Sequence, residues 1–143
     1  MISRKMQKLR AFMRIAHELA TLGTCCRAKV GCLILRKDGT LAGGGYNGAI
    51  KGMPHCTDET CNSKQRCLHT SHAEENAVSF SSGDIHTAFV THEPCLNCTR
   101  MLARRGLKHI YYTKAYNSMP EQERAERDAI LKHCEITLEV LDV

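Results

Sequence analysis

The stretch that decides the fold reads HAEENAVSFSSGDIHTAFVTHEPCLNC and covers residues 72–98. A short polar motif stands at each end of it, His-Ala-Glu at 72–74 and Pro-Cys-Leu-Asn-Cys at 94–98. The residues between them, 75–93, are enough for one helix, one strand and a turn. The sequence therefore predicts a helix–strand–helix unit in which each helix begins at a motif.

The flanking sequence extends this pattern in both directions. Apolar residues at helical spacing predict helices over about 3–22, 72–80, 95–105 and 121–133. Short apolar or alternating runs predict strands over 30–35, 41–46, 88–91, 110–112 and 136–140. Asp38-Gly39 predicts a hairpin, and Gly106 suits the end of a helix. The order predicts an α/β protein with three α/β/α layers around a five-stranded mixed sheet.

Size and composition narrow the class of protein. The 143 residues fit one domain, and the formal charge of +5 suits an anionic ligand, either nucleotide phosphate or nucleic acid. The chain has no Trp and only 5% aromatic residues, which is little for a base-stacking surface. It shows neither a membrane-length apolar run nor a signal peptide, so we expect a cytoplasmic protein without a membrane partner. Nine cysteines in a reducing compartment indicate metal ligands.

The two motifs together indicate a catalytic zinc site. Such a site uses three protein ligands and keeps one position open for water, and His72, Cys95 and Cys98 supply the three. Cys95 and Cys98 are expected on one side of a helix start, where the thiolate form is favoured. Glu74 lies close enough to His72 to reach the bound water and to move its protons. The pattern H-x-E…P-C-x-x-C is the signature of zinc deaminases.

Each motif alone has a plainer interpretation. Ser71 to Glu74 also fits a capping box, in which Glu74 only binds the start of the helix. Cys95 and Cys98 also fit a redox pair or half of a structural zinc knuckle. Their combination, with Pro94 before the first cysteine, favours the deaminase.

Longer segments resemble one family. Gly45-Tyr46-Asn47-Gly48, the Cys-rich loop, the segment 71–77 and the segment 90–98 resemble the deoxycytidylate deaminases of the cytidine deaminase superfamily. The resemblance covers about residues 9–116. It implies the cytidine deaminase-like fold and the hydrolysis of dCMP to dUMP and ammonia. It also implies a homo-oligomer, hexamer or dimer, that dCTP activates and dTTP inhibits, although residues 81–86 lack the basic residue that some members use near the effector.

The resemblance also implies individual contacts. Asn47 is expected at the sugar, and the backbone N–H of Ala73 at the base carbonyl. Tyr116 is expected beside the substrate, and Arg27 and Lys29 at the 5′-phosphate. The effector is expected at Gly45, Tyr46, Asn47 and Gly48. Tyr116, Arg27 and Lys29 also fit plain surface or packing roles, and Gly45 to Gly48 also fit a tight turn that uses Asn and Gly at positive φ.

The remaining cysteines suggest a second metal. The spacing of Cys56, Cys61 and Cys67 resembles deoxycytidylate deaminases with a structural zinc, and Cys25 is the candidate fourth ligand. Four cysteines would close a tetrahedral site without an open position. His69 and Cys26 are candidate substitutes, and the alternative is a set of unpaired buried cysteines.

Three other functions remain open at this point. Some relatives accept dCTP. A nucleic-acid cytidine or adenosine deaminase is favoured slightly by Glu93-Pro94-Cys95, but the few aromatic residues count against nucleic acid. A non-enzymatic zinc module would have no use for Glu74 as a proton carrier.

Overall fold

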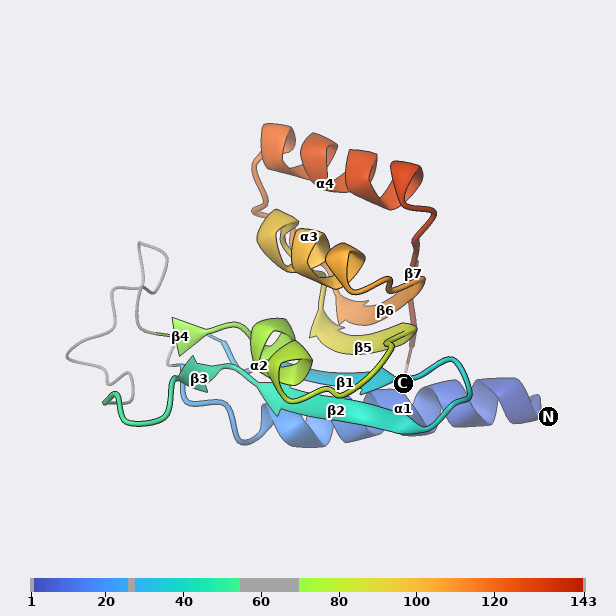
Figure 1. Ribbon diagram of the computed structural model, residues 1–143, viewed down its shortest axis with the longest axis horizontal. Helices are drawn as coiled ribbons and strands as arrows, with labels where there is room; N and C mark the ends of the chain where they lie inside the picture. The colour runs from blue at the N-terminus through green and yellow to red at the C-terminus, as the bar shows by residue number, and fades with distance from the viewer. Residues whose placement is uncertain (1, 26–27, 55–69, 143) are drawn as a thin grey trace.

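The computed structural model describes residues 2–25, 28–54 and 70–142 (Figure 1). Its main sheet has five strands in the order β2-β1-β5-β6-β7. Their bounds are β1 Gly31–Leu35, β2 Leu41–Tyr46, β5 Thr87–His92, β6 His109–Lys114 and β7 Thr137–Val140. The helices are α1 Arg4–Ala20, α2 Ala73–Ser79, α3 Leu96–Arg104 and α4 Glu121–His133. A small two-stranded sheet pairs β3 Gly48–Ala49 with β4 Thr70–Ser71.

The sheet is mixed and lies between layers of helices. β1 pairs antiparallel with both β2 and β5, whereas β5, β6 and β7 are parallel. α1 packs on one face of the sheet, α2 and α3 cover the other, and α4 packs on α3 (Figure 1). The predicted three-layer α/β/α architecture is confirmed.

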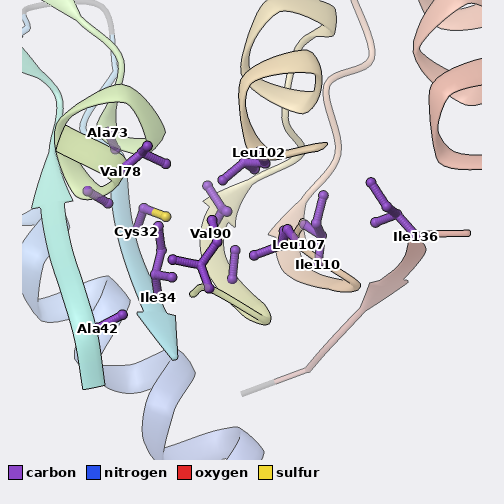
Figure 2. Close-up of a cluster of buried hydrophobic side chains, with 13 residues drawn as sticks. Cys32, Ile34, Ala42, Ala73, Val78, Val90, Leu102, Leu107, Ile110 and Ile136 are labelled. Carbon is purple, nitrogen blue, oxygen red and sulfur yellow. The ribbon is translucent and has the colours of Figure 1, made fainter. Parts of the chain in front are cut away.

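Each face of the sheet has its own apolar core. Successive residues of a strand point to opposite faces, so Cys32 and Ile34 belong to the core under α2 and α3, and Leu33 and Leu35 to the core under α1. Figure 2 shows the first core, where Val90 of β5 lies among side chains from β1, α2 and α3. Because β1 is covered on both faces, all five of its residues are buried.

Two glycines let helices approach the sheet closely. A Cβ at Gly31 would strike the carbonyl of Ala16 in α1. A Cβ at Gly45 would lie 2.6 Å from the backbone nitrogen of Ala77 in α2. The second contact sets α2, and therefore the motif at its start, directly on β2.

Capping residues and glycines in turns set the ends of several helices and strands. The Ser3 hydroxyl accepts a hydrogen bond from the Met6 backbone at 3.1 Å and starts α1. Gly39 in the hairpin and Gly106 after α3 have φ of +89° and +83°, as their sequence roles predict. The β3–β4 pair was not predicted, because two-residue strands carry no alternating pattern. None of the helices in the described ranges is long and apolar enough to span a bilayer.

Candidate active site

Three predicted metal ligands meet where two helices begin. His72 is the N-cap of α2, Cys95 is the N-cap of α3, and Cys98 lies in the first turn of α3. Their ligand atoms all lie within 4.8 Å of one another. His72 Nδ1 is 3.3 Å from Cys98 Sγ and 3.7 Å from Cys95 Sγ. Nitrogen and sulfur ligands of a tetrahedral zinc are about 3.5 Å apart, so this donor set fits zinc.

The two thiols share their charge unequally. A hydrogen bond from the Cys98 thiol, aided by His72 and opposed by burial, lowers the pKa of Cys95 to about 4. The same Cys95 partner and burial raise the pKa of Cys98 above its usual value. The pair therefore shares one proton, and zinc binding would remove it, because thiolate is the form in which cysteine binds metal.

Glu74 is not the residue that caps α2. The Glu75 carboxylate accepts the His72 backbone N–H at 3.0 Å, so the helix begins one residue later than the capping box of Ser71 and Glu74 would require. That alternative is wrong. Glu74 is instead 4% exposed, and burial, opposed by His72, raises its pKa to about 7.

A cleft of about 730 Å³ opens over this group. His72, Ala73, Glu74 and Cys95 lie in its lining on the side of α2 and α3. Further lining residues come from several other segments, among them Cys25 and Val30 before β1, Asn47 between β2 and β3, His92 and Glu93 at the end of β5, and 114–118 from the end of β6 onward. The cleft therefore brings together residues from distant parts of the sequence around the metal group.

The predicted substrate contacts divide into two groups. Asn47, Ala73 and Tyr116 line the cleft, whereas Lys29 is exposed and outside its lining. The Asn47 amide accepts from the Val30 backbone at 2.8 Å and donates to the Ala28 carbonyl at 2.7 Å, so it also holds the entrance to β1 in place. Arg27 lies outside the described residues.

The segment 45–48 is not a turn at positive φ. Among the described residues, Glu135 is the non-glycine residue with positive φ, so Tyr46 and Asn47 do not have it. Gly45 and Gly48 do not have positive φ either. Gly45 lies in β2 against α2, Tyr46 ends that strand, and Gly48 begins β3, where it pairs with Ser71 directly before the metal motif. The tight-turn alternative is wrong, because these residues complete one strand and start the next.

The second metal site falls mostly beyond the described ranges. Cys25 is buried and lines the cleft. Cys26, Cys56, Cys61, Cys67 and His69 lie outside the described residues.

A basic group occupies the ends of β5 and β6. His92 and Lys114 are neighbours in the parallel register, and both line the cleft. Burial, with the nearby charges of Lys114 and His17, lowers the pKa of His92. A lowered pKa favours the neutral form of His92, so Lys114 supplies the positive charge by which this edge suits an anionic ligand.

Sequence reasoning missed a buried ion-pair network that extends from Glu93 in the cleft wall to α4. Glu93 is 6% exposed and Arg127 of α4 is 3% exposed, and their side chains form a salt bridge. The same Glu93 oxygen accepts from Arg124 at 2.8 Å, and the other accepts the Tyr116 backbone N–H at 2.9 Å. Nothing in residues 117–143 signals this role, because an arginine on a charged helix normally indicates a solvated face.

Known proteins are similar to this chain in sequence. Residues 6–114 match the family model for the cytidine and deoxycytidylate deaminase zinc-binding region. The Bacillus subtilis protein named ComE operon protein 2 is 40% identical over 115 residues, which are 76% of this chain and 60% of that protein. The deoxycytidylate deaminase of Saccharomyces cerevisiae is 30% identical over 129 residues, which are 82% of this chain and 41% of that enzyme.

A solved structure agrees over nearly the full length. The dCMP deaminase of cyanophage S-TIM5, crystallised in complex with dCMP and dUMP, is 25% identical, with a TM-score of 0.76 over 98% of this chain and 99% of the phage chain. By contrast, the chain spans 60% or less of the two relatives above. The family match contains both motifs that build the metal group. The chain therefore belongs to the family of cytidine and deoxycytidylate deaminases that carries this zinc-binding region.

Proposed function

We propose that the protein hydrolyses dCMP to dUMP and ammonia, with a zinc ion held by His72, Cys95 and Cys98. The observation that carries the proposal is the position of Glu74, which is buried beside the three ligands in the wall of the cleft while Glu75 serves the helix. A zinc site with a structural role only would have no need of that carboxylate.

The residues of the cleft suit the reaction. Zinc in such a site supplies hydroxide at neutral pH, because it lowers the pKa of water to about 7. Glu74 accepts the proton released from water and passes it to the ring nitrogen N3 as the oxygen adds to C4. It then carries the proton of the new hydroxyl to the amino group, the C4–N bond breaks, and ammonia leaves. Ala73 N–H binds the base carbonyl, and Tyr116 and Asn47 hold the base and sugar.

The basic edge of the cleft supports a nucleotide over a nucleoside. Lys114, beside His92, would meet the 5′-phosphate there. Lys29 lies outside the cleft lining and Arg27 outside the described residues, so their contacts with the phosphate stay predictions. A charge-assisted contact of this kind is lost with an uncharged nucleoside. The cyanophage enzyme crystallised with dCMP and dUMP lends the same support.

The experiment is a substrate panel of dCMP, dCTP, deoxycytidine and cytidine, followed by loss of the cytosine absorbance. We expect dCMP to have the highest kcat/KM of the four substrates. Lys114→Gln should reduce kcat/KM for dCMP more than it reduces kcat/KM for deoxycytidine. Equal processing of deoxycytidine and dCMP would instead indicate a nucleoside deaminase, and preferred dCTP a triphosphate enzyme. Filter binding of single-stranded DNA and tRNA tests the nucleic-acid deaminase.

Two further proposals concern metal and control. A second, structural zinc would be held by Cys25, Cys56, Cys61 and Cys67, and the buried position of Cys25 supports it. The protein would form a hexamer or dimer, with dCTP and dTTP acting at Gly45 to Gly48. The pairing of β3 with β4 supports this, because it joins that segment to the residue before His72.

A further inference from the structure

We infer that Glu93 is a positioning residue that fixes the Tyr116 segment, residues 115–118, as a wall of the nucleotide pocket, and that α4 takes part in substrate binding by holding Glu93. The inference rests on the proposed function only for the identity of the nucleotide. Tyr116, Asn117 and Ser118 line the cleft. Glu93, two residues before Cys95, lies at the junction of β5, α3 and this wall.

Both oxygens of Glu93 are committed to fixed partners. Oε1 accepts the backbone N–H of Tyr116 at 2.9 Å. Oε2 accepts from the guanidinium groups of Arg124 and Arg127. Because Arg127 is as buried as Glu93, neither charge has water as an alternative partner. The carboxylate is therefore held in one orientation.

Arg124 completes the connection to the wall. Its Nη1 donates to Glu93 at 2.8 Å, and its Nη2 donates to the Tyr116 carbonyl at 2.6 Å. The backbone of Tyr116 is thus bound at both its N–H and its C=O, in each case by a charged side chain. Charge-assisted hydrogen bonds are about twice as strong as neutral ones, so this irregular segment is held in place by α4 and the end of β5.

Arg124 contacts Glu93 and Tyr116, and neither contact involves the start of α2, where Glu74 lies. His72 and Glu74 belong to the start of α2, whereas Arg124 approaches Tyr116 from α4. Loosening the wall should therefore weaken nucleotide binding more than it slows the chemical step. A residue that only stabilised the fold would not separate KM from kcat in this way.

The experiment compares Arg124→Met with Arg124→Lys in the zinc-loaded protein. The Arg124 side chain is 36% exposed, so its replacement should leave the fold intact. Arg104→Met is the matched control, an exposed arginine in the last turn of α3. The readouts are KM and kcat for dCMP, calorimetric binding of dUMP, zinc content, and hydrogen exchange of the Tyr116 amide.

We expect Arg124→Met to raise both KM and the dUMP Kd about tenfold, because two hydrogen bonds are lost, one to the Tyr116 carbonyl in the wall and one to the Glu93 carboxylate that holds the wall. Its kcat should stay within about threefold, its zinc content should not change, and the Tyr116 amide should exchange faster. Arg124→Lys should restore part of each effect, and Arg104→Met should show none.

Two results would overturn the inference. One is unchanged Tyr116 exchange and unchanged KM in Arg124→Met. The other is a loss of zinc and kcat at constant KM, which would make the network a support of the metal loop. Wild-type protein that neither binds dUMP nor deaminates dCMP would contradict the proposed function instead, and the exchange measurement would still decide whether Arg124 holds the wall.

Discussion

Adjacent side chains on α2 have separate tasks because of helix geometry. Residues next to each other on a helix point about 100° apart. Glu75 therefore turns back to the His72 backbone, while Glu74 points into the cleft beside the metal group. A one-residue difference in where the helix begins decides which carboxylate is available for chemistry.

This arrangement predicts the result of exchanging each carboxylate for an amide. Glu74→Gln should keep fold and zinc but lose about 10²–10⁴-fold in kcat, the usual contribution of general acid–base catalysis. Glu75→Gln is the matched control, because an amide oxygen can still accept the His72 N–H, and its kcat should stay within about threefold. Ammonia release and zinc content are the measurements. Near-normal turnover of Glu74→Gln would contradict the mechanism.

The ligand assignments predict the zinc content of the protein. Zinc measured by atomic emission should be two ions per chain for wild type and one for Cys95→Ser, which loses an anionic ligand at the catalytic site. Cys61→Ser should also lose one ion, but from the structural site. The exposed Cys134 offers a control, and Cys134→Ser should keep both. A wild-type content of one zinc ion per chain would contradict the structural site.

At the scale of elements, α2 begins after His72, contains Glu74, and is placed by its contact with β2. The Cβ of an alanine at 45 would lie 2.6 Å from Ala77 N, 2.9 Å from Asn76 Cβ and 3.0 Å from Ala73 O. Backbone atoms cannot turn aside as a flexible side chain can. Helix and strand would therefore have to separate.

Gly45→Ala should lower the free energy of unfolding by about 1–3 kcal/mol, the usual cost of overpacking, and should reduce kcat by displacing His72 and Glu74. Gly39→Ala is the control. Its new Cβ meets nothing within 4 Å, and only the positive φ is strained, so it should lose stability without losing kcat. Urea unfolding and steady-state rates measure both. An active Gly45→Ala protein would show that α2 has room to move.

The buried pair of α4 and β5 predicts a dependence of stability on pH. Burial tends to raise the pKa of Glu93, but the Tyr116 N–H and Arg127 outweigh it and lower the pKa. Because the pKa of Glu93 is lower in the folded protein, its ionised form stabilises the fold at pH values above the unfolded pKa of about 4.3. This contribution is lost as the pH falls through the folded pKa.

Arg127→Met should therefore lower the free energy of unfolding by about 1.5–3 kcal/mol at pH 7, because the buried carboxylate loses one of its two guanidinium partners and keeps Arg124. The difference from wild type should begin to shrink as the pH falls below the unfolded pKa of about 4.3, and it should go on shrinking as the pH falls through the lowered folded pKa of Glu93. Urea unfolding across this pH range measures it, with Arg104→Met as the control. A constant difference would mean that lost packing, and not charge, explains the effect.

At the scale of the whole molecule, the sheet leaves β2 at its edge and the segment 45–48 at the end of that strand. Tyr46 there is 38% exposed. An effector bound at this segment can change activity only if it favours one arrangement of the active site over another.

We therefore expect light scattering to give a multiple of the 16.0 kDa chain mass. The dCMP rate curve should be sigmoidal, and dCTP should make it hyperbolic while dTTP lowers the rate. Tyr46→Ala should weaken the response to both triphosphates and leave the basal kcat unchanged. A monomer with a hyperbolic curve that neither triphosphate moves would leave residues 45–48 as a wall of the substrate site only.

The sequence alone determined the helices, the strands of the main sheet and the metal group of this protein. Those features depend on local spacing: helical and alternating periods, caps and turns, and ligands placed where helices begin. His72, Cys95 and Cys98 could be predicted because their short motifs fix their places on two helix starts.

Only the tertiary structure decided which residues surround that group. Because α2 begins after His72, Glu75 caps it and Glu74 faces the cleft. The close contact at Gly45 sets the position of α2 on β2, and the pairing of β5 with β6 places His92 beside Lys114. Glu93 meets Arg124 and Arg127 across some thirty residues of sequence. No periodicity encodes such a pairing, because it depends on how α4 packs against α3, and that packing depends on the whole sheet.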